Sequence, residues 1–124
     1  MALEWTFRND LPIYSQLVER IKLGIISGAL PPGARLNSVR DLAMEAGVNP
    51  NTMQRALSEL EREGLVFTQR TSGRFVTEDT AAIARCKKTL GGRHIRGFLA
   101  AMTLLGYQRR EIIDLLQEEK EEES

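Results

Sequence analysis

The chain has 124 residues, 42% of them hydrophobic, which is enough for one small domain and an appendage. Its 17 basic and 17 acidic residues give a formal net charge of zero, so affinity for an acidic partner must come from a local cluster of charge or from dimerisation. One cysteine, Cys86, excludes an internal disulfide, and no apolar run approaches the roughly 20 residues that span a bilayer, so we expect a soluble, cytoplasmic protein with no membrane partner.

The first part of the sequence predicts an extended segment and a long helix. Aromatic residues alternate within residues 3–8, as in a segment that packs one face on a core. Asp10, two residues before a proline, predicts the cap of a helix. Apolar residues then recur every four positions over 13–25, and Gly28 ends the pattern. After a turn with two prolines, residues 35–36 are expected to pair briefly as a strand.

Residues 38–63 predict two helices that meet at a tight turn. Ser38 is an N-cap for the first helix, and Gly47 ends it, because the residue after a helix commonly needs positive φ. Asn49 caps the second helix, and Pro50 suits its first position, where no N–H donor is required. These features are typical of a helix-turn-helix.

Polar side chains crowd the leading half of the second helix. Asn or Gln can read adenine, Arg can read guanine, and the free N–H groups of a helix N-terminus favour phosphate. A helix-turn-helix presents this end to the major groove. An ordinary helical hairpin with a solvated face is the alternative, but the coincidence of cap, glycine and a polar leading turn favours DNA binding. The outward side chains are Asn51, Thr52, Gln54, Arg55 and Ser58.

After Gly64 the pattern changes from helical to alternating. Residues 65–69 and 74–77 predict two strands joined by a hairpin loop at 70–73. A hairpin after a recognition helix is a wing, whose tip can reach the sugar-phosphate backbone or the minor groove. A plain surface hairpin is the alternative, but arginines on both sides of the loop favour phosphate. The predicted contacts are Gln69, Arg70, Ser72 and Arg74.

Residues 79–124 predict two helices and an acidic tail. Asp79 can cap the first helix, which the Gly91-Gly92 pair interrupts at about 1 kcal/mol per glycine relative to alanine. The pair marks either a kink or the close approach of another backbone. Gly106-Tyr107 makes a turn into a short last helix.

The predicted division is a winged helix-turn-helix DNA-binding domain over 1–78 and an α-helical dimerisation arm with an acidic tail over 79–124. The arm is too small to fold alone, so we expect its apolar face to pack against a second copy. The predicted dimerisation residues are Ile83, Leu90, Phe98, Met102, Leu105, Ile112 and Leu116.

Four stretches carry a family resemblance: PGARLNSVRDLA (32–43), GVNPNTMQRA (47–56), LEREGL (60–65) and GRFV (73–76). Together they resemble the winged-helix domain of GntR-family bacterial transcription regulators. The run at 49–52 and the short two-helix tail look like the YtrA-like subfamily. The resemblance covers about residues 11–76, and the tail by architecture only.

The resemblance implies a mostly helical α+β fold and a homodimer that binds a palindromic operator, usually as a repressor released by a signal. In the family, the arginine at the Arg40 position contacts DNA, as do residues at 49, 51, 52 and 54 and at the wing tip. Subfamily relatives often control operons for membrane transporters.

The sequence differs from the usual family pattern at two positions that bear on DNA binding. Asn37 stands where the family usually has proline, which predicts a looser start of the next helix. Thr71 replaces the first of two wing glycines, which argues against close insertion of the wing backbone.

The first functional hypothesis is a dimeric repressor whose recognition helices enter successive major grooves about 34 Å apart. Arg40 and Arg70 would bind phosphates, while Asn51, Gln54 and Arg55 would discriminate bases. The full predicted DNA-binding set is Ser38, Arg40, Asn49, Asn51, Thr52, Gln54, Arg55, Gln69, Arg70, Ser72 and Arg74.

Two other functions are alternatives to DNA binding. A winged helix used as a protein-interaction module without DNA binding is supported by the zero net charge and by Glu59, Glu61 and Glu63. An enzyme has little support, because the chain has one histidine, one cysteine, no glycine-rich phosphate loop and no cleft with paired carboxylates.

Cys86 and His94 lie eight residues apart and can share a helix face. A metal or redox sensor is one interpretation, but a packed thiol and a surface or interface imidazole is favoured. Two ligands do not close a zinc site, although a dimer can supply four. We expect no metal and no cofactor.

The arm offers two further hypotheses about partners. Its basic stretch is a solvated face or pairs with the acidic tail of the partner subunit; it comprises Arg85, Lys87, Lys88, Arg93 and Arg96. A small-molecule effector of unknown identity would need a pocket at the dimer interface, lined by Phe98, Met102 and Tyr107, although core packing explains these residues equally well.

Overall fold

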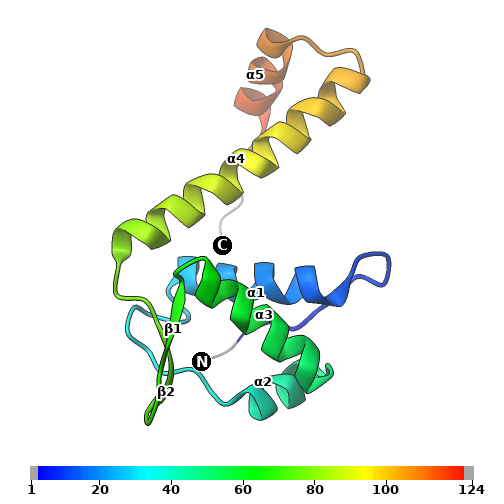
Figure 1. Cartoon of the computed structure of the whole chain (residues 1–124). Helices are drawn as coiled ribbons and strands as arrows, with labels where there is room; N and C mark the ends of the chain where they lie inside the picture. The colour runs from blue at the N-terminus through cyan, green and yellow to red at the C-terminus, as the bar shows by residue number, and fades with distance from the viewer. Residues whose placement is uncertain (1–2, 122–124) are drawn as a thin grey trace. The chain divides into compact units, whose positions relative to one another are not determined.

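The computed structural model describes residues 3–121 and confirms the mostly helical α+β fold, with a winged helix-turn-helix followed by two C-terminal helices. The chain forms two compact units, Met1–Lys87 and Lys88–Ser124. Figure 1 shows the elements, which in chain order are α1 (Ile13–Ser27), α2 (Val39–Ala46), α3 (Pro50–Arg62), β1 (Val66–Gln69), β2 (Gly73–Val76), α4 (Thr80–Leu104) and α5 (Arg109–Glu118).

The start of α1 differs from the sequence prediction. Its N-cap is Pro12, without a side-chain cap, so the predicted capping role of Asp10 is wrong. The Asp10 carboxylate instead accepts from Arg8, with 3.0 Å between Nε and Oδ1. Proline suits the position because its ring fixes φ and it has no N–H to satisfy. The helix ends at Gly28 with φ of 87°, as predicted.

The core of the first unit lies where α1 packs against α3. Its largest fully buried side chains are Leu17, Ile21, Leu30, Met53, Leu57, Leu60 and Val76. Burying each such side chain stabilises the fold by about 1.5–3 kcal/mol. At the end of α3 the buried Lys22 ammonium lies 2.8 Å from the Glu63 carboxylate, so an ion pair joins the two helices.

The caps of the helix-turn-helix are confirmed. The Ser38 hydroxyl accepts from the Asp41 N–H at 3.1 Å, and α2 ends at Gly47 with φ of 70°. The Asn49 side chain accepts from the Asn51 N–H at 2.7 Å, and Pro50 opens α3. These bonds satisfy N–H groups that the first turn of a helix leaves free.

The wing is an antiparallel hairpin in which Val66 pairs with Val76 and Gln69 with Gly73. The predicted brief strand is also confirmed, because Arg35 forms an isolated bridge with Phe75. The loop before α2 is thereby fixed along the outer edge of β2.

The N-terminal segment packs as its alternation predicted. Leu3, Trp5 and Phe7 are half-buried against the core, while the residues between them are exposed. Gly24 makes room for this segment, since a Cβ at that position would lie only 2.5 Å from Leu3 Cδ2.

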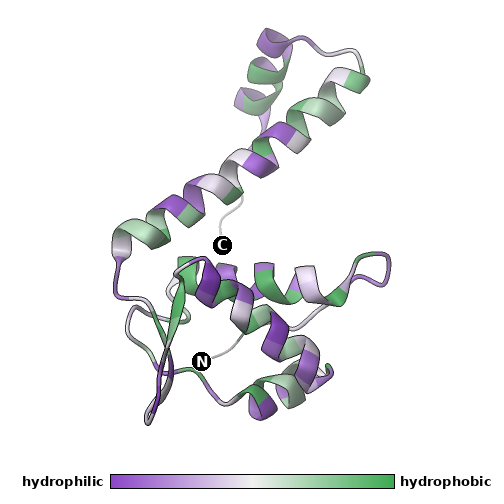
Figure 2. Ribbon diagram, in the orientation of Figure 1, coloured by the Kyte–Doolittle hydropathy of each residue, from purple (hydrophilic) through white to green (hydrophobic). Residues whose placement is uncertain are grey.

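The last two helices, α4 and α5, agree with the sequence prediction at the start of α4 and at the turn between them, but not at the Gly91-Gly92 pair. The Asp79 carboxylate accepts from the N–H groups of Ala81 and Ala82, at 3.0 and 3.2 Å, as predicted. The predicted interruption at Gly91-Gly92 is wrong, because α4 continues through both glycines. Their cost of about 1 kcal/mol each is small beside the hydrogen bonds of a long helix. Gly106, with φ of 96°, makes the predicted turn. Figure 2 shows hydrophilic and hydrophobic residues interspersed along α4 and α5.

Candidate nucleic-acid interface

The leading half of α3 presents a polar face because its opposite side is fully used by the core. Met53, Ala56 and Leu57 have no exposed surface. Helical geometry therefore places Asn51 and Gln54 on the outside, and both are exposed. Thr52 is half-buried.

Two of these polar side chains are already oriented by hydrogen bonds. The side-chain oxygen of Asn49, Oδ1, accepts the capping hydrogen bond of α3, which leaves the side-chain NH₂ group available as a donor. Gln54 donates from Nε2 to the Ser58 hydroxyl at 3.1 Å, so its own oxygen remains available. Side chains restrained in this way lose less conformational freedom when they bind.

Arg55 is held toward α1 by a cation–π contact. Its Cζ lies 4.0 Å from the centroid of the Tyr14 ring. Such contacts contribute about 0.5–1 kcal/mol at exposed sites. The Tyr14 hydroxyl in turn donates to Glu59 at 3.4 Å. Arg55 is exposed as predicted, but its position is set by a partner that the sequence pattern did not reveal.

The acidic residues of late α3 are neutralised within the same unit. Glu59 accepts from Arg62 at 2.7 Å, and this hydrogen bond lowers the pKa of the Glu59 carboxyl. Glu61 accepts from Thr68 and from Arg74, and the Thr68 hydrogen bond is the largest cause that lowers the pKa of Glu61. These carboxylates therefore do not form an unpaired acidic surface.

Arg74 occupies a different place from the other predicted wing contacts. Its side chain is 19% exposed, and its Nε lies 2.7 Å from the Glu61 carboxylate. The guanidinium therefore points to α3, and its ion pair with Glu61 joins the wing to that helix.

The tip of the wing is open to solvent. Gln69, Arg70 and Ser72 are exposed, and the Ser72 N–H donates to the Gln69 carbonyl at 3.2 Å. Gly73 follows with φ of 108°, a conformation that side chains other than glycine rarely adopt.

Three exposed arginines of the first unit have no partner among the residues that the structure describes. Within residues 3–121, Arg35, Arg40 and Arg70 make no ion pair, ring contact or side-chain hydrogen bond. They come from the loop before α2, from α2 and from the wing tip. Figure 1 shows α2, the first turn of α3 and the wing tip facing the same, lower side of the first unit. The segments that carry these unpaired arginines thus lie on the side of the first unit to which the start of α3 is turned. Arg35 was not predicted, although its place in a short pairing strand was.

Asn37, which stands where the family usually has proline, makes a side-chain hydrogen bond to α2. Its side-chain nitrogen donates to the Glu45 carboxylate at 2.9 Å, which ties the segment before α2 to the last part of that helix. The looser start of α2 that this difference predicts stays a prediction.

The predicted dimerisation residues fall into two groups. Leu90 and Ile112 are buried within the chain, and Ile83 is half-buried against the core of the first unit. Phe98, Leu105 and Leu116 are exposed, and Met102 is half-buried.

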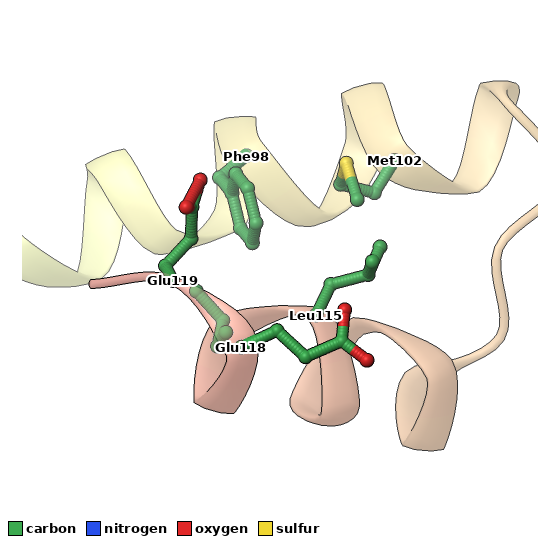
Figure 3. A pocket seen from close by; sticks show the side chains of 6 residues that line it. Phe98, Met102, Leu115, Glu118 and Glu119 are labelled. Carbon is green, nitrogen blue, oxygen red and sulfur yellow. The ribbon is translucent and has the colours of Figure 1, made fainter.

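A groove of about 440 Å³ lies between α4 and α5 in the second unit (Figure 3). Phe98 and Met102 line it from α4, and Tyr107 is not among its lining residues; the predicted effector pocket at a dimer interface is a different site and stays a prediction. The other lining residues are Leu115, Leu116, Glu118 and Glu119.

The thiol of Cys86 is half-buried against the core, as the packed interpretation predicted. His94 is exposed on α4. Across residues 3–121, no three or more His, Cys, Asp or Glu side chains are grouped so that they can hold a metal ion. No helix in that same range has both the length and the apolar character needed to cross a membrane.

The fold and the polar, arginine-flanked face define a winged helix-turn-helix DNA-binding protein. Residues 13–76, more than half of the chain, match the family described as "Bacterial regulatory proteins, gntR family". The chain belongs to this family and is a DNA-binding transcriptional regulator, not an enzyme.

Individual relatives agree with the family assignment. The chain is 37% identical over 108 residues to the uncharacterized HTH-type transcriptional regulator YhcF of Bacillus subtilis, covering 87% of this chain and 89% of YhcF. It is 42% identical over 72 residues to the HTH-type transcriptional repressor YtrA of B. subtilis, covering 58% of this chain and 55% of YtrA.

Two solved structures are also similar. A GntR family transcriptional regulator from Listeria monocytogenes has a TM-score of 0.86 at 34% identity, covering 92% of this chain and all of that chain. The DNA-binding domain of AraR in complex with operator ORX1 has a TM-score of 0.56 at 28% identity, covering 62% of this chain and 99% of that chain. The small, YtrA-like type of GntR regulator that the sequence resembles is therefore confirmed.

Proposed function

We propose that this regulator is a repressor that binds a palindromic operator as a homodimer in the cytoplasm. The observation that carries the proposal is the exposed polar start of α3, flanked by the unpaired Arg40 and Arg70. Two relatives support the proposal: YtrA is described as a transcriptional repressor, and the AraR domain was solved in complex with an operator.

The polar face supports a division of labour among its residues. Asn51 and Gln54 read base edges, and Thr52 and Arg55 add contacts beside them. Ser38 and Asn49 hold the helix starts at the phosphate backbone. Arg40 and Arg70 bind phosphates, and Gln69 and Ser72 extend the contact of the wing, while Arg74 positions the wing through Glu61.

The exposed apolar residues of α4, α5 and the turn between them support dimerisation. Leu104 is 90% exposed and Leu105 is 73% exposed, and Ile113 and Leu116 are also exposed. Apolar groups gathered on a small two-helix unit indicate a protein interface, and a second copy can cover them. We therefore propose residues 79–124 as the dimerisation arm and 1–78 as the DNA-binding domain, with the operator released when an unidentified effector or other signal acts on the arm.

Selection of bound sites from a random DNA library, combined with sedimentation of the complex, tests this function. We expect inverted half-sites whose centres lie about 34 Å apart on the duplex, bound by two subunits. A single unrepeated half-site, or one subunit per selected site, would contradict the homodimer. Failure to enrich any sequence would contradict operator binding.

Repression is tested separately, by placing the selected site across a promoter that drives a reporter. We expect the chain to lower reporter output, and an Arg40→Ala variant to restore it. Increased output from the intact chain would show activation instead.

A further inference from the structure

The backbone of Arg35 is fixed to the wing by its two neighbours. The Val76 N–H donates to the Ala34 carbonyl at 2.9 Å, and the Leu36 N–H donates to the Arg74 carbonyl at 2.8 Å. Arg35 itself pairs with Phe75. The residue therefore belongs to a short third strand at the outer edge of β2, although it lies before α2 in the sequence.

The side chain of Arg35 runs toward the wing tip. Side chains alternate along a strand, so Arg35, Phe75 and Gly73 share one face of the wing. A Cβ placed on Gly73 would lie 3.2 Å from Nε and 3.4 Å from an Nη atom of Arg35. The guanidinium is therefore seated against the backbone of Gly73, beside the hairpin loop that carries Arg70.

Arg35 and Arg74 lie on opposite faces of the wing and differ in their electrostatic surroundings. Arg74 is paired with Glu61 and mostly buried. Arg35 is exposed and has no carboxylate partner within the described range of 3–121. A planar guanidinium that is held in place but unpaired is suited to bind a phosphate through two N–H donors.

We propose that Arg35, seated on Gly73, binds a phosphate of the operator backbone next to the one bound by Arg70. The inference rests on the proposed operator contact of the wing. It makes the wing a composite site, built from a hairpin arginine and an arginine brought in from the loop before α2. Since the contact is made by side chains, it does not require the wing backbone to insert, which suits Thr71 at the place of a glycine.

The test compares Arg35→Gln with Arg62→Gln in the full chain, using the selected operator over a range of salt concentrations. Both substitutions remove one positive charge, but Arg62 lies at the opposite end of α3 and is paired with Glu59. We expect Arg35→Gln to weaken binding about tenfold, as for hydrogen bonds to charged groups. The slope of log K against log salt should become shallower by about 0.9 for each bound subunit, while Arg62→Gln leaves it unchanged.

Two further measurements keep the outcome clear. Interference by phosphate ethylation should identify a phosphate that matters for the wild type and no longer matters for Arg35→Gln. Arg35→Lys should retain most of the salt slope, because it keeps the charge.

An unchanged slope for Arg35→Gln, with reduced slopes for Arg40→Ala and Arg70→Ala, would overturn this inference and leave the proposed function standing. Unchanged slopes for all three would overturn the proposed operator surface itself.

Discussion

The two compact units differ in how completely they bury their apolar residues. The first surrounds a continuous core whose largest side chains are almost inaccessible, including Leu57 and Leu60. In residues 88–121 of the second, Leu90 and Ile112 are the only buried hydrophobic side chains, while Leu104 is 90% exposed. The comparison indicates that the winged helix buries its own apolar side chains, whereas the α4–α5 unit leaves most of its apolar side chains in contact with solvent.

The largest expected effect comes from opening the core of the winged helix. Leu57→Ala should lower the free energy of unfolding by about 2–5 kcal/mol, because it leaves a cavity at a fully buried site. Urea unfolding followed by circular dichroism measures it. Leu23→Ala is the matched control at a position of the same unit that is 42% exposed, and an equal loss for both variants would show that burial does not set the cost.

The next effect concerns the exposed apolar residues of the second unit. Replacing both Leu104 and Leu105 by Glu should raise the dissociation constant of the dimer at least about 100-fold, because charges would have to be buried in an apolar interface. Analytical ultracentrifugation measures it, with Gln117→Glu as a control that adds charge at a different place in the unit, on α5. A dimer of unchanged affinity would show that these leucines lie outside the interface.

Substitutions on the DNA-binding face should separate phosphate contacts from base contacts. Arg40→Ala should weaken binding about tenfold on every operator variant. Gln54→Ala should instead relax the preference at one base position, worth about 1–3 kcal/mol of discrimination. Gel shifts on a panel of single-base operator variants distinguish the two, with Arg8→Ala as a control at an arginine already paired with Asp10. Reversed behaviour of the two variants would reverse their assigned roles.

The smallest effect is expected from the tie between α3 and the wing. Hydrogen bonds from Thr68 and Arg74 lower the pKa of the Glu61 carboxyl from its ordinary value of 4.5, so the ionised carboxylate is favoured in the folded chain. The contribution of the ionised Glu61 carboxylate to the free energy of unfolding is therefore fully present above pH 4.5, and it is lost as the pH falls through the lowered pKa. Glu61→Gln should cost less than about 1 kcal/mol at pH 7, as for other partly exposed ion pairs.

The pH profile of that variant is the informative readout. The difference in unfolding free energy between the wild type and Glu61→Gln should shrink as the pH is lowered below 4.5. Glu4→Gln, at an exposed position in the N-terminal segment, serves as the control. A difference that grows in acid would contradict the assigned sign.

Several features could be predicted from the sequence because they depend on neighbouring residues. The caps at Ser38, Asn49 and Asp79 and the chain reversals at Gly28 and Gly47 are local, and each lies where the pattern indicated. The predicted strands also formed, with bounds shifted by one residue. The two local errors were Asp10, which bonds to Arg8, and the Gly91-Gly92 pair, whose small helical penalty was given too much weight.

What the sequence by itself determined is the order of helices and strands, the helix-turn-helix, the polar character of the start of α3 and the family resemblance, because periodicity and capping act over a few residues. The tertiary structure alone decided which charged side chains are available. Glu61 on α3 neutralises Arg74 on the wing, and Tyr14 holds Arg55. Arg35 reaches Gly73 from a distant part of the chain and stays unpaired. Such pairings join residues that lie far apart in the sequence, so no local pattern specifies them.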